Sequence, residues 1–231
     1  MKTYKIHFIR HGMTSANISG KYNGREDLPL CDEGREEIEE YVQSGDYPTV
    51  QMVYTSPLER AVETAEIIYP DTFMQIVDEL EEFDFGDFEG KTPEELMDNP
   101  EYGDWISIMN TSGAPGGESS KDFIDRISNG LQIVIANMMR NDIKDAAVIT
   151  HGGIISTLLS KYVYPHRGIN EWITGNGRGY TVLIHSGFWE KSGVMELYDK
   201  IPSLHGEYEY YDEDAYLDYA ESLLDDDEYN D

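Results

Sequence analysis

The stretch Tyr4-Lys5-Ile6-His7-Phe8-Ile9-Arg10-His11-Gly12-Met13-Thr14 contains the feature around which the chain is organised. Residues 4–9 are mostly apolar, as in a strand buried on both faces, and this pattern stops abruptly at Arg10-His11-Gly12. Open α/β sheets bind ligands beyond the carboxyl ends of their strands. Arginine suits phosphate oxygens, and a neutral imidazole can act as a nucleophile or carry a proton. Taken alone, the stretch fits a buried strand with a polar turn equally well.

The rest of the chain alternates strand and helix patterns. Strands are predicted at residues 50–54, 73–77 and 145–150, and two late strands at 178–185 and 194–198, joined by a turn. This order predicts an α/β fold, a three-layer sandwich with a mostly parallel sheet, helices on both faces and antiparallel edge strands.

Capping residues predict where the helices begin. Asp32 is the expected N-cap of a helix that runs to residue 42, and Ser119 or Ser120 the cap of a long helix that ends near residue 140. The run Ser56-Pro57-Leu58-Glu59 has the pattern of a capping box, with Ser56 as N-cap. Arg60 then falls in the first turn, where the helix end is already positive, and a nearby anion would explain it. Short helices are predicted at 92–97 and 102–109.

Composition limits the range of partners. The net charge of −29 argues against nucleic acid and anionic membranes, and 1 cysteine, Cys31, excludes an internal disulfide. Without a signal-peptide core or a membrane span, we expect a cytoplasmic protein that is a monomer or homodimer. We expect a domain at 1–200 and an acidic, tyrosine-rich tail at 201–231. The tail is either an amphipathic helix that docks on the body or on a partner, or a disordered, solubilising segment.

Charged side chains follow successive strands. Arg10 and His11 follow the first, Arg60 the second, Glu82 the third and His151 the fourth. The carboxyl ends of parallel strands lie at one edge, so these groups are predicted to converge on a phosphate site. Arginines would hold the phosphate, one histidine would attack phosphorus, and the other would donate to a phosphate oxygen. A partly buried Glu82 beside carboxylates would have a raised pKa and protonate the leaving group. The spacing of His, Cys and acidic residues predicts no metal site, and the reaction needs no cofactor.

Several segments together resemble the histidine phosphatase superfamily, also called the phosphoglycerate mutase-like family. They occur in the family's order over residues 3–185: Arg10-His11-Gly12-Met13-Thr14 with Asn17, Ser56-Pro57-Leu58 with Arg60-Ala61, Glu82 with Phe85-Gly86, Gly116-Gly117-Glu118-Ser119, and Thr150-His151-Gly152-Gly153. The resemblance implies that His11 is the nucleophile and that Glu82 is the proton donor, although Glu81 competes for this assignment. It implies a phosphate pocket made by Arg10, Asn17, Gly24, Arg60, His151 and Gly152. Met13 departs from the Glu or Gln that is commoner there.

The resemblance leaves several functions open. The expected function is hydrolysis of a small phosphomonoester through a phosphohistidine, as in the broad-specificity and α-ribazole phosphatases. One alternative is a cofactor-dependent phosphoglycerate mutase. The resemblance argues against it, because the mutases of this family carry a longer insertion between the acid segment and the Gly-Gly-Glu-Ser loop than residues 90–116 provide. The other alternative is a regulatory module that binds phosphate without turnover. The loops at 20–30, 91–115 and 176–178 are expected to set specificity.

Overall fold

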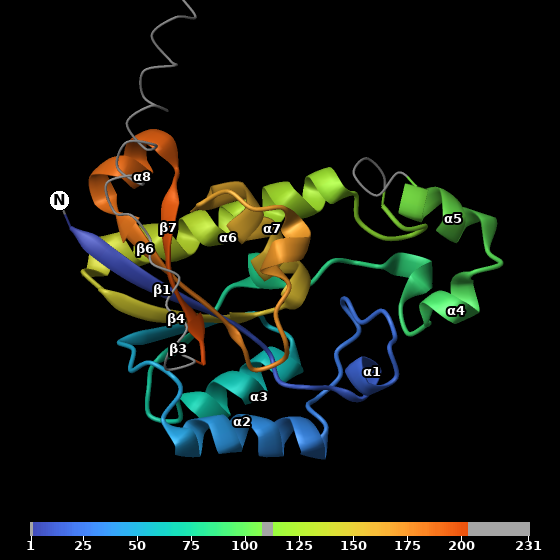
Figure 1. Cartoon of the computed structure of the whole chain (residues 1–231), viewed down its shortest axis with the longest axis horizontal. Helices are drawn as coiled ribbons and strands as arrows, with labels where there is room; N and C mark the ends of the chain where they lie inside the picture. The colour runs from blue at the N-terminus through green and yellow to red at the C-terminus, as the bar shows by residue number, and fades with distance from the viewer. Residues whose placement is uncertain (1, 108–112, 203–231) are drawn as a thin grey trace, which may run out of the picture.

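A seven-stranded sheet forms the centre of the computed structural model, which describes residues 2–107 and 113–202 (Figure 1). The spatial order of the strands is β3-β2-β4-β1-β6-β7-β5. Their bounds are β1 Thr3–Arg10, β2 Met52–Thr55, β3 Met74–Ile76, β4 Asp145–Thr150, β5 Val163–Tyr164, β6 Gly179–His185 and β7 Met195–Ile201.

Strand direction divides the sheet into two halves. Neighbours among β1, β2, β3 and β4 are parallel, so their carboxyl ends share one edge. In the other half, β6 runs antiparallel to both β1 and β7, while the two-residue β5 is parallel to β7. Parallel pairs thus form most of the sheet and antiparallel pairs lie towards one side, as predicted. The expected turn between the late strands is wrong, because the helix α8 (Ser186–Ser192) connects β6 to β7.

Helices cover both faces of the sheet and confirm the three-layer architecture. On one face, α2 (Asp32–Ser44) and α3 (Glu59–Ile68) pack on side chains such as Ile9 and Ile149. On the other lie α6 (Ser120–Asn141), α7 (Gly152–Tyr162) and α8 (Figure 1). The predicted apolar stripe of α6 is buried against the sheet, at Phe123, Ile127, Leu131, Ile135 and Met138.

Short helices lie beyond the carboxyl edge of the parallel strands (Figure 1). They are α1 (Ser15–Ile18), α4 (Pro93–Leu96) and α5 (Pro100–Ser107), with 3₁₀ turns at Asp78–Leu80, Gly86–Phe88 and, elsewhere, Ile169–Trp172. A separate cluster of buried side chains joins this region, made by Phe88, Leu96, Tyr102, Trp105 and Ala114. The predicted end of the helix at 102–109 lies outside the described residues, and so does the tail from residue 203 onwards.

Two predicted helix caps are wrong, while Ser119 is confirmed as the cap of α6. The N-cap of α2 is Cys31 rather than Asp32: its sulfur accepts from the Gly34 N–H at 3.3 Å and donates to the Met13 carbonyl at 3.3 Å. Helix α3 begins at Glu59 without a side-chain cap, so the predicted capping box does not form. The Ser56 hydroxyl has another partner, which lies in the candidate site.

Candidate active site

His11 lies directly after β1 and is held in one orientation. Its backbone N–H donates to the Thr150 carbonyl at 2.9 Å, and its ring Nδ1 lies 2.6 Å from the Gly12 carbonyl. A carbonyl only accepts, so Nδ1 carries the ring proton and Nε2 keeps its lone pair. Burial lowers the pKa of His11 well below its usual value, and Arg60 and Arg10 lower it further. The imidazole is therefore neutral at physiological pH, as a nucleophile requires.

The guanidinium groups of the two predicted arginines, Arg10 and Arg60, lie close enough to this ring for their charges to act on it. Arg60 is fully buried and donates to the Gly24 carbonyl at 2.6 Å and the Glu26 carbonyl at 2.9 Å. Arg10 donates to the Thr174 carbonyl at 2.8 Å. Burial lowers the pKa of both guanidinium groups, while Glu82 raises it. Arginine remains charged, so this pocket is locally positive in a chain of net charge −29.

His151 follows β4 and comes next to His11, as predicted. The two ring centroids are 5.1 Å apart, and burial lowers the pKa of His151 well below its usual value. Its Nε2 lies 2.8 Å from the hydroxyl of Ser56. The capping box fails because the Glu59 N–H, which the serine would have to accept from, donates to Asp27 Oδ1 at 2.7 Å instead.

Glu82, rather than Glu81, reaches the predicted cluster. Glu82 is buried and accepts from the Phe83 and Gly153 backbone N–H groups at 2.9 and 3.0 Å, while Glu81 pairs with Arg25 at 3.5 Å. Burial raises the pKa of Glu82 against the opposing effects of these hydrogen bonds and the arginines. The raised pKa is as expected, but its cause is burial rather than neighbouring carboxylates.

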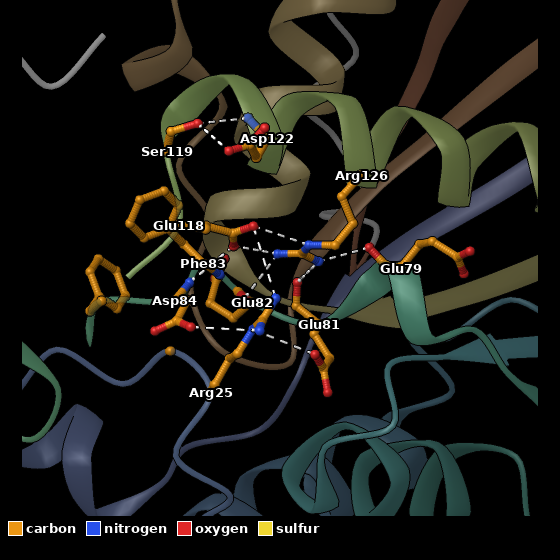
Figure 2. A network of polar contacts seen from close by, with 12 residues as sticks. Arg25, Glu79, Glu81, Glu82, Phe83, Asp84, Glu118, Ser119, Asp122 and Arg126 are labelled. Atoms are coloured by element: carbon orange, nitrogen blue, oxygen red, sulfur yellow. Dashed lines mark hydrogen bonds and ion pairs between the residues drawn. The ribbon is translucent and has the colours of Figure 1, made fainter. Parts of the chain in front are cut away.

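Arg126 on α6 holds the segment that carries Glu82 (Figure 2). Its guanidinium donates to the carbonyls of Glu79, Glu81 and Glu82 at 3.0, 2.7 and 3.2 Å, and it pairs with the Glu118 carboxylate. Glu118 also accepts from the Asp84 N–H at 3.0 Å. Four hydrogen bonds that involve one partly buried arginine and one carboxylate thus fix the backbone on both sides of Glu82. Sequence reasoning missed Arg126, which resembles any polar residue of a long helix.

The predicted substrate-binding residues differ in what they offer. Asn17 accepts through Oδ1 from the Thr14 N–H at 3.0 Å, which leaves its Nδ2 to donate to a ligand. The Gly24 N–H is already used by the Glu89 carboxylate at 2.9 Å. Gly24 instead supplies its carbonyl to Arg60, and a Cβ on it would lie 1.9 Å from the Phe83 carbonyl oxygen. Gly152, the first residue of α7, lies against Arg10: a Cβ there would be 3.3 Å from Nε.

Residues 176–178 form hydrogen bonds with the backbone of Arg10, His11 and Gly12. Asn176 Nδ2 lies 3.0 Å from the His11 carbonyl, 3.2 Å from that of Gly12 and 3.3 Å from Asn17 Oδ1. The Gly177 N–H donates to the Arg10 carbonyl at 3.0 Å, and the Arg10 N–H to the Arg178 carbonyl at 2.9 Å. The sequence predicted a specificity loop at 176–178, but the structure shows its backbone and Asn176 fixing the position of Arg10 and His11.

Three buried nitrogen atoms of this cluster have no hydrogen-bond partner within the described residues: Nε of Arg10, Nε of Arg60 and Nδ1 of His151. Buried polar groups are nearly always paired, so partnerless nitrogens gathered on three of the predicted residues make this cluster a candidate binding site. Two of them belong to cations, which suits an anionic ligand. Among the described residues, no group of three or more His, Cys, Asp or Glu side chains is placed to hold a metal ion. None of the helices in residues 2–107 and 113–202 is long and apolar enough to cross a membrane.

Comparisons with known proteins agree with this geometry. The family described as "Histidine phosphatase superfamily (branch 1)" matches residues 6–216. An adenosylcobalamin/alpha-ribazole phosphatase of Escherichia coli strain K12 is 30% identical over 69% of this chain and 79% of its own length. The "Uncharacterized phosphatase PhoE" of Bacillus subtilis is 34% identical over 66% of this chain and 74% of its own. The alpha-ribazole phosphatase structure from Shigella flexneri, at 22% identity, shares the fold with a TM-score of 0.71, covering 88% of this chain and 100% of that one.

Proposed function

Because the chain belongs to the histidine phosphatase superfamily, we propose that it hydrolyses a small phosphomonoester through a phosphohistidine formed on His11. The observation that carries this proposal is the cluster of buried nitrogens without partners around a neutral His11. The arginines and His151 would hold the phosphoryl oxygens, with Asn17 Nδ2 as a further donor. Phosphoryl transfer is mostly positioning and charge stabilisation, which these groups supply.

The first half-reaction uses His11 and Glu82. Nε2 of His11 attacks phosphorus with its lone pair, and the bond from phosphorus to the ester oxygen breaks. The leaving oxygen takes a proton from the carboxyl group of Glu82, whose burial raises its pKa and so favours the protonated form. The arginines balance the charge that spreads over the equatorial oxygens.

Water completes the cycle in the second half-reaction. Glu82, now a carboxylate, accepts a proton from a water molecule as that oxygen attacks the phosphohistidine. The bond from phosphorus to Nε2 breaks, inorganic phosphate leaves, and His11 and Glu82 return to their starting protonation states. The donors that hold the phosphoryl group are the same in both halves.

The substrate class follows from what surrounds the acid. Phe85 follows Glu82 by three residues, and its partly exposed ring packs on that of Tyr22, with centroids 5.0 Å apart. Arg25, also next to Gly24, is occupied by Glu81 and Asp84. We infer that the leaving group has an uncharged or cationic portion that contacts these aromatic rings, rather than a second anionic group.

Rapid-quench analysis with a labelled phosphomonoester tests the proposal. We expect acid-labile, base-stable label on His11 during turnover, none on His11→Ala, and phosphate release from a simple aryl phosphate without bisphosphoglycerate. Mutase activity without net release, or label that remains in the His11→Ala protein, would contradict it. Binding of phosphate without any turnover would instead support a regulatory module.

A further inference from the structure

The hydroxyl of Ser56 is placed to act on His151 rather than on a helix end. Ser56 follows β2 and His151 follows β4, and pairing of these strands sets them side by side: the Ser56 N–H donates to the Ile149 carbonyl at 3.0 Å. Both side chains are fully buried, and Oγ lies 2.8 Å from Nε2. Contacts within the protein, and not solvent, therefore determine the orientation of the ring and the direction of the hydroxyl.

The direction of this hydrogen bond can be assigned by counting donors and acceptors. The Leu58 N–H donates to Ser56 Oγ at 3.3 Å, so one lone pair of the hydroxyl is in use. The hydroxyl has one hydrogen, and within the described residues Nε2 of His151 is the acceptor that it reaches. A buried hydroxyl that donated to nothing would pay for its lost hydration without a hydrogen bond in return. Ser56 therefore donates, and Nε2 accepts through its lone pair.

We propose that Ser56 is a positioning residue that fixes the tautomer of His151, so that Nδ1–H is the donor directed at the phosphoryl group. Nδ1 is the buried nitrogen of this ring that has no partner within residues 2–107 and 113–202. If the ring proton sat on Nε2, Nδ1 would present a lone pair to an anion and repel it. The inference rests on the proposed function for the identity of the anion.

In each histidine, a hydrogen bond at one ring nitrogen thereby determines the role of the other nitrogen, and the two roles are opposite. The Gly12 carbonyl accepts from Nδ1 of His11 and leaves the Nε2 lone pair free to attack. The Ser56 hydroxyl donates to Nε2 of His151 and leaves Nδ1–H free to donate. The rings lie 5.1 Å apart, and an acceptor beside one and a donor beside the other give them different tautomers.

Nitrogen NMR of the free, full-length protein tests the inference directly. With ¹⁵N-labelled histidine, and His151→Gln to assign its signals among the 6 histidines, we expect a protonated Nδ1 and an unprotonated Nε2 in the wild type. Added inorganic phosphate should move the Nδ1 signal most. A protonated Nε2 in the wild type would overturn the proposal without any variant at Ser56.

Ser56→Ala should release the tautomer and weaken phosphate binding. We expect a mixture of both tautomers and a loss of about ten- to a hundredfold in phosphate affinity and in kcat/KM, the worth of one hydrogen bond to a charged group. Ser156→Ala is the matched control, because Ser156 is also buried but donates to the Gly153 carbonyl at 3.2 Å. An unchanged tautomer in Ser56→Ala would overturn the inference. If that variant does not fold, Ser56→Cys keeps the volume with a weaker donor and should shift the tautomer partway.

The two proposals fail in distinguishable ways. The tautomer is measured without substrate, so a wild-type protein with protonated Nδ1 but no label on His11 would refute the phosphohistidine mechanism and leave the role of Ser56 standing. Normal labelling with a protonated Nε2 would do the reverse.

Discussion

Replacement of Glu82 by Gln separates proton donation from phosphate binding. The variant keeps the size of the side chain but cannot donate an acidic proton. Removal of a general acid costs about 10²–10⁴ in rate when the leaving group needs a proton. We therefore expect kcat/KM, which reports the step in which the leaving group departs, to fall by that factor for an alkyl phosphate. For an aryl phosphate, whose phenolate leaves unprotonated, the fall in kcat/KM should be less than about tenfold.

The structure also predicts the side effects of this change. Each Glu82 oxygen accepts one backbone N–H, at 2.9 and 3.0 Å, and the amide nitrogen of Gln would face one of them. We expect a loss of about 1–3 kcal/mol in the free energy of unfolding, measured in urea. If the urea experiment shows that the variant is still folded under the assay conditions, its loss of rate reports on chemistry and not on unfolding.

The pH profile gives a second readout with a definite sign. Burial raises the pKa of Glu82, and the acid form is the active one, so wild-type kcat/KM for the alkyl phosphate should fall as pH rises through that pKa. The variant should lack this limb. The same shift makes wild-type stability fall as pH rises from the usual carboxyl pKa through the raised one, because the folded state releases its proton later.

Glu81→Gln is the control, because Glu81 lies next in the chain and pairs with Arg25 instead. It should change kcat less than about twofold for either substrate. A leaving-group-dependent loss of kcat/KM in Glu81→Gln, or an equal loss of kcat/KM for both substrates in Glu82→Gln, would refute the assignment of Glu82 as the acid.

Three further changes test two residues that support the site, Gly24 and Arg126, and the buried His7. Gly24→Ala should lower kcat/KM by about a hundredfold, because its Cβ would meet a carbonyl oxygen 1.9 Å away and displace the loop that holds Arg60; a phosphatase assay measures it. Arg126→Met should lower the free energy of unfolding by about 3 kcal/mol, since it removes the ion pair with the partly buried Glu118 and the donor of three backbone carbonyls, and urea denaturation measures this. Burial lowers the pKa of His7 to about 4, so the wild type should lose about 3 kcal/mol as pH falls from about 6.5 to 4, and His7→Gln should lose less over that range in thermal or urea unfolding.

Each change has a matched control. Gly103→Ala places a Cβ on an exposed helix where nothing lies within 4 Å, and should leave activity unchanged. Lys121→Met breaks an exposed pair on the same helix as Arg126, and should cost less than about 1 kcal/mol. His166→Gln, which changes an exposed histidine instead of the buried His7, is the control for the His7 variant. Equal effects in a variant and its control would contradict the corresponding prediction.

The sequence predicted those parts of the site that depend on local pattern and strand order. Residues 4–9 and 145–150 read as buried strands because their apolar side chains leave no solvent face, and strand direction then brought His11 and His151 to one edge. Glu82 was separable from Glu81 by its spacing to Phe85-Gly86, and the structure places Glu82 in the cluster. These inferences needed no contact between distant residues beyond the sheet itself.

The parts that failed or were missed depend on contacts that no local pattern records. Ser56 fits a helix cap by sequence, but its hydroxyl meets a ring 95 positions later in the chain. Glu89 accepts from Gly24 across 65 positions, and Arg126 reaches the Glu82 carbonyl across 44. Such contacts between distant residues become visible only when the tertiary structure is known.

The contacts of residues 174–178 with Arg10 and His11 have a consequence for synthesis on the ribosome. The first strand emerges early, yet its carbonyls and the Arg10 guanidinium find their partners in Thr174, Asn176 and Gly177. β6, the neighbour of β1 on that side, follows immediately. A nascent chain that ends before this point would have the attacking histidine without these contacts to its backbone. We therefore expect fragments that end before residue 174 to lack phosphatase activity.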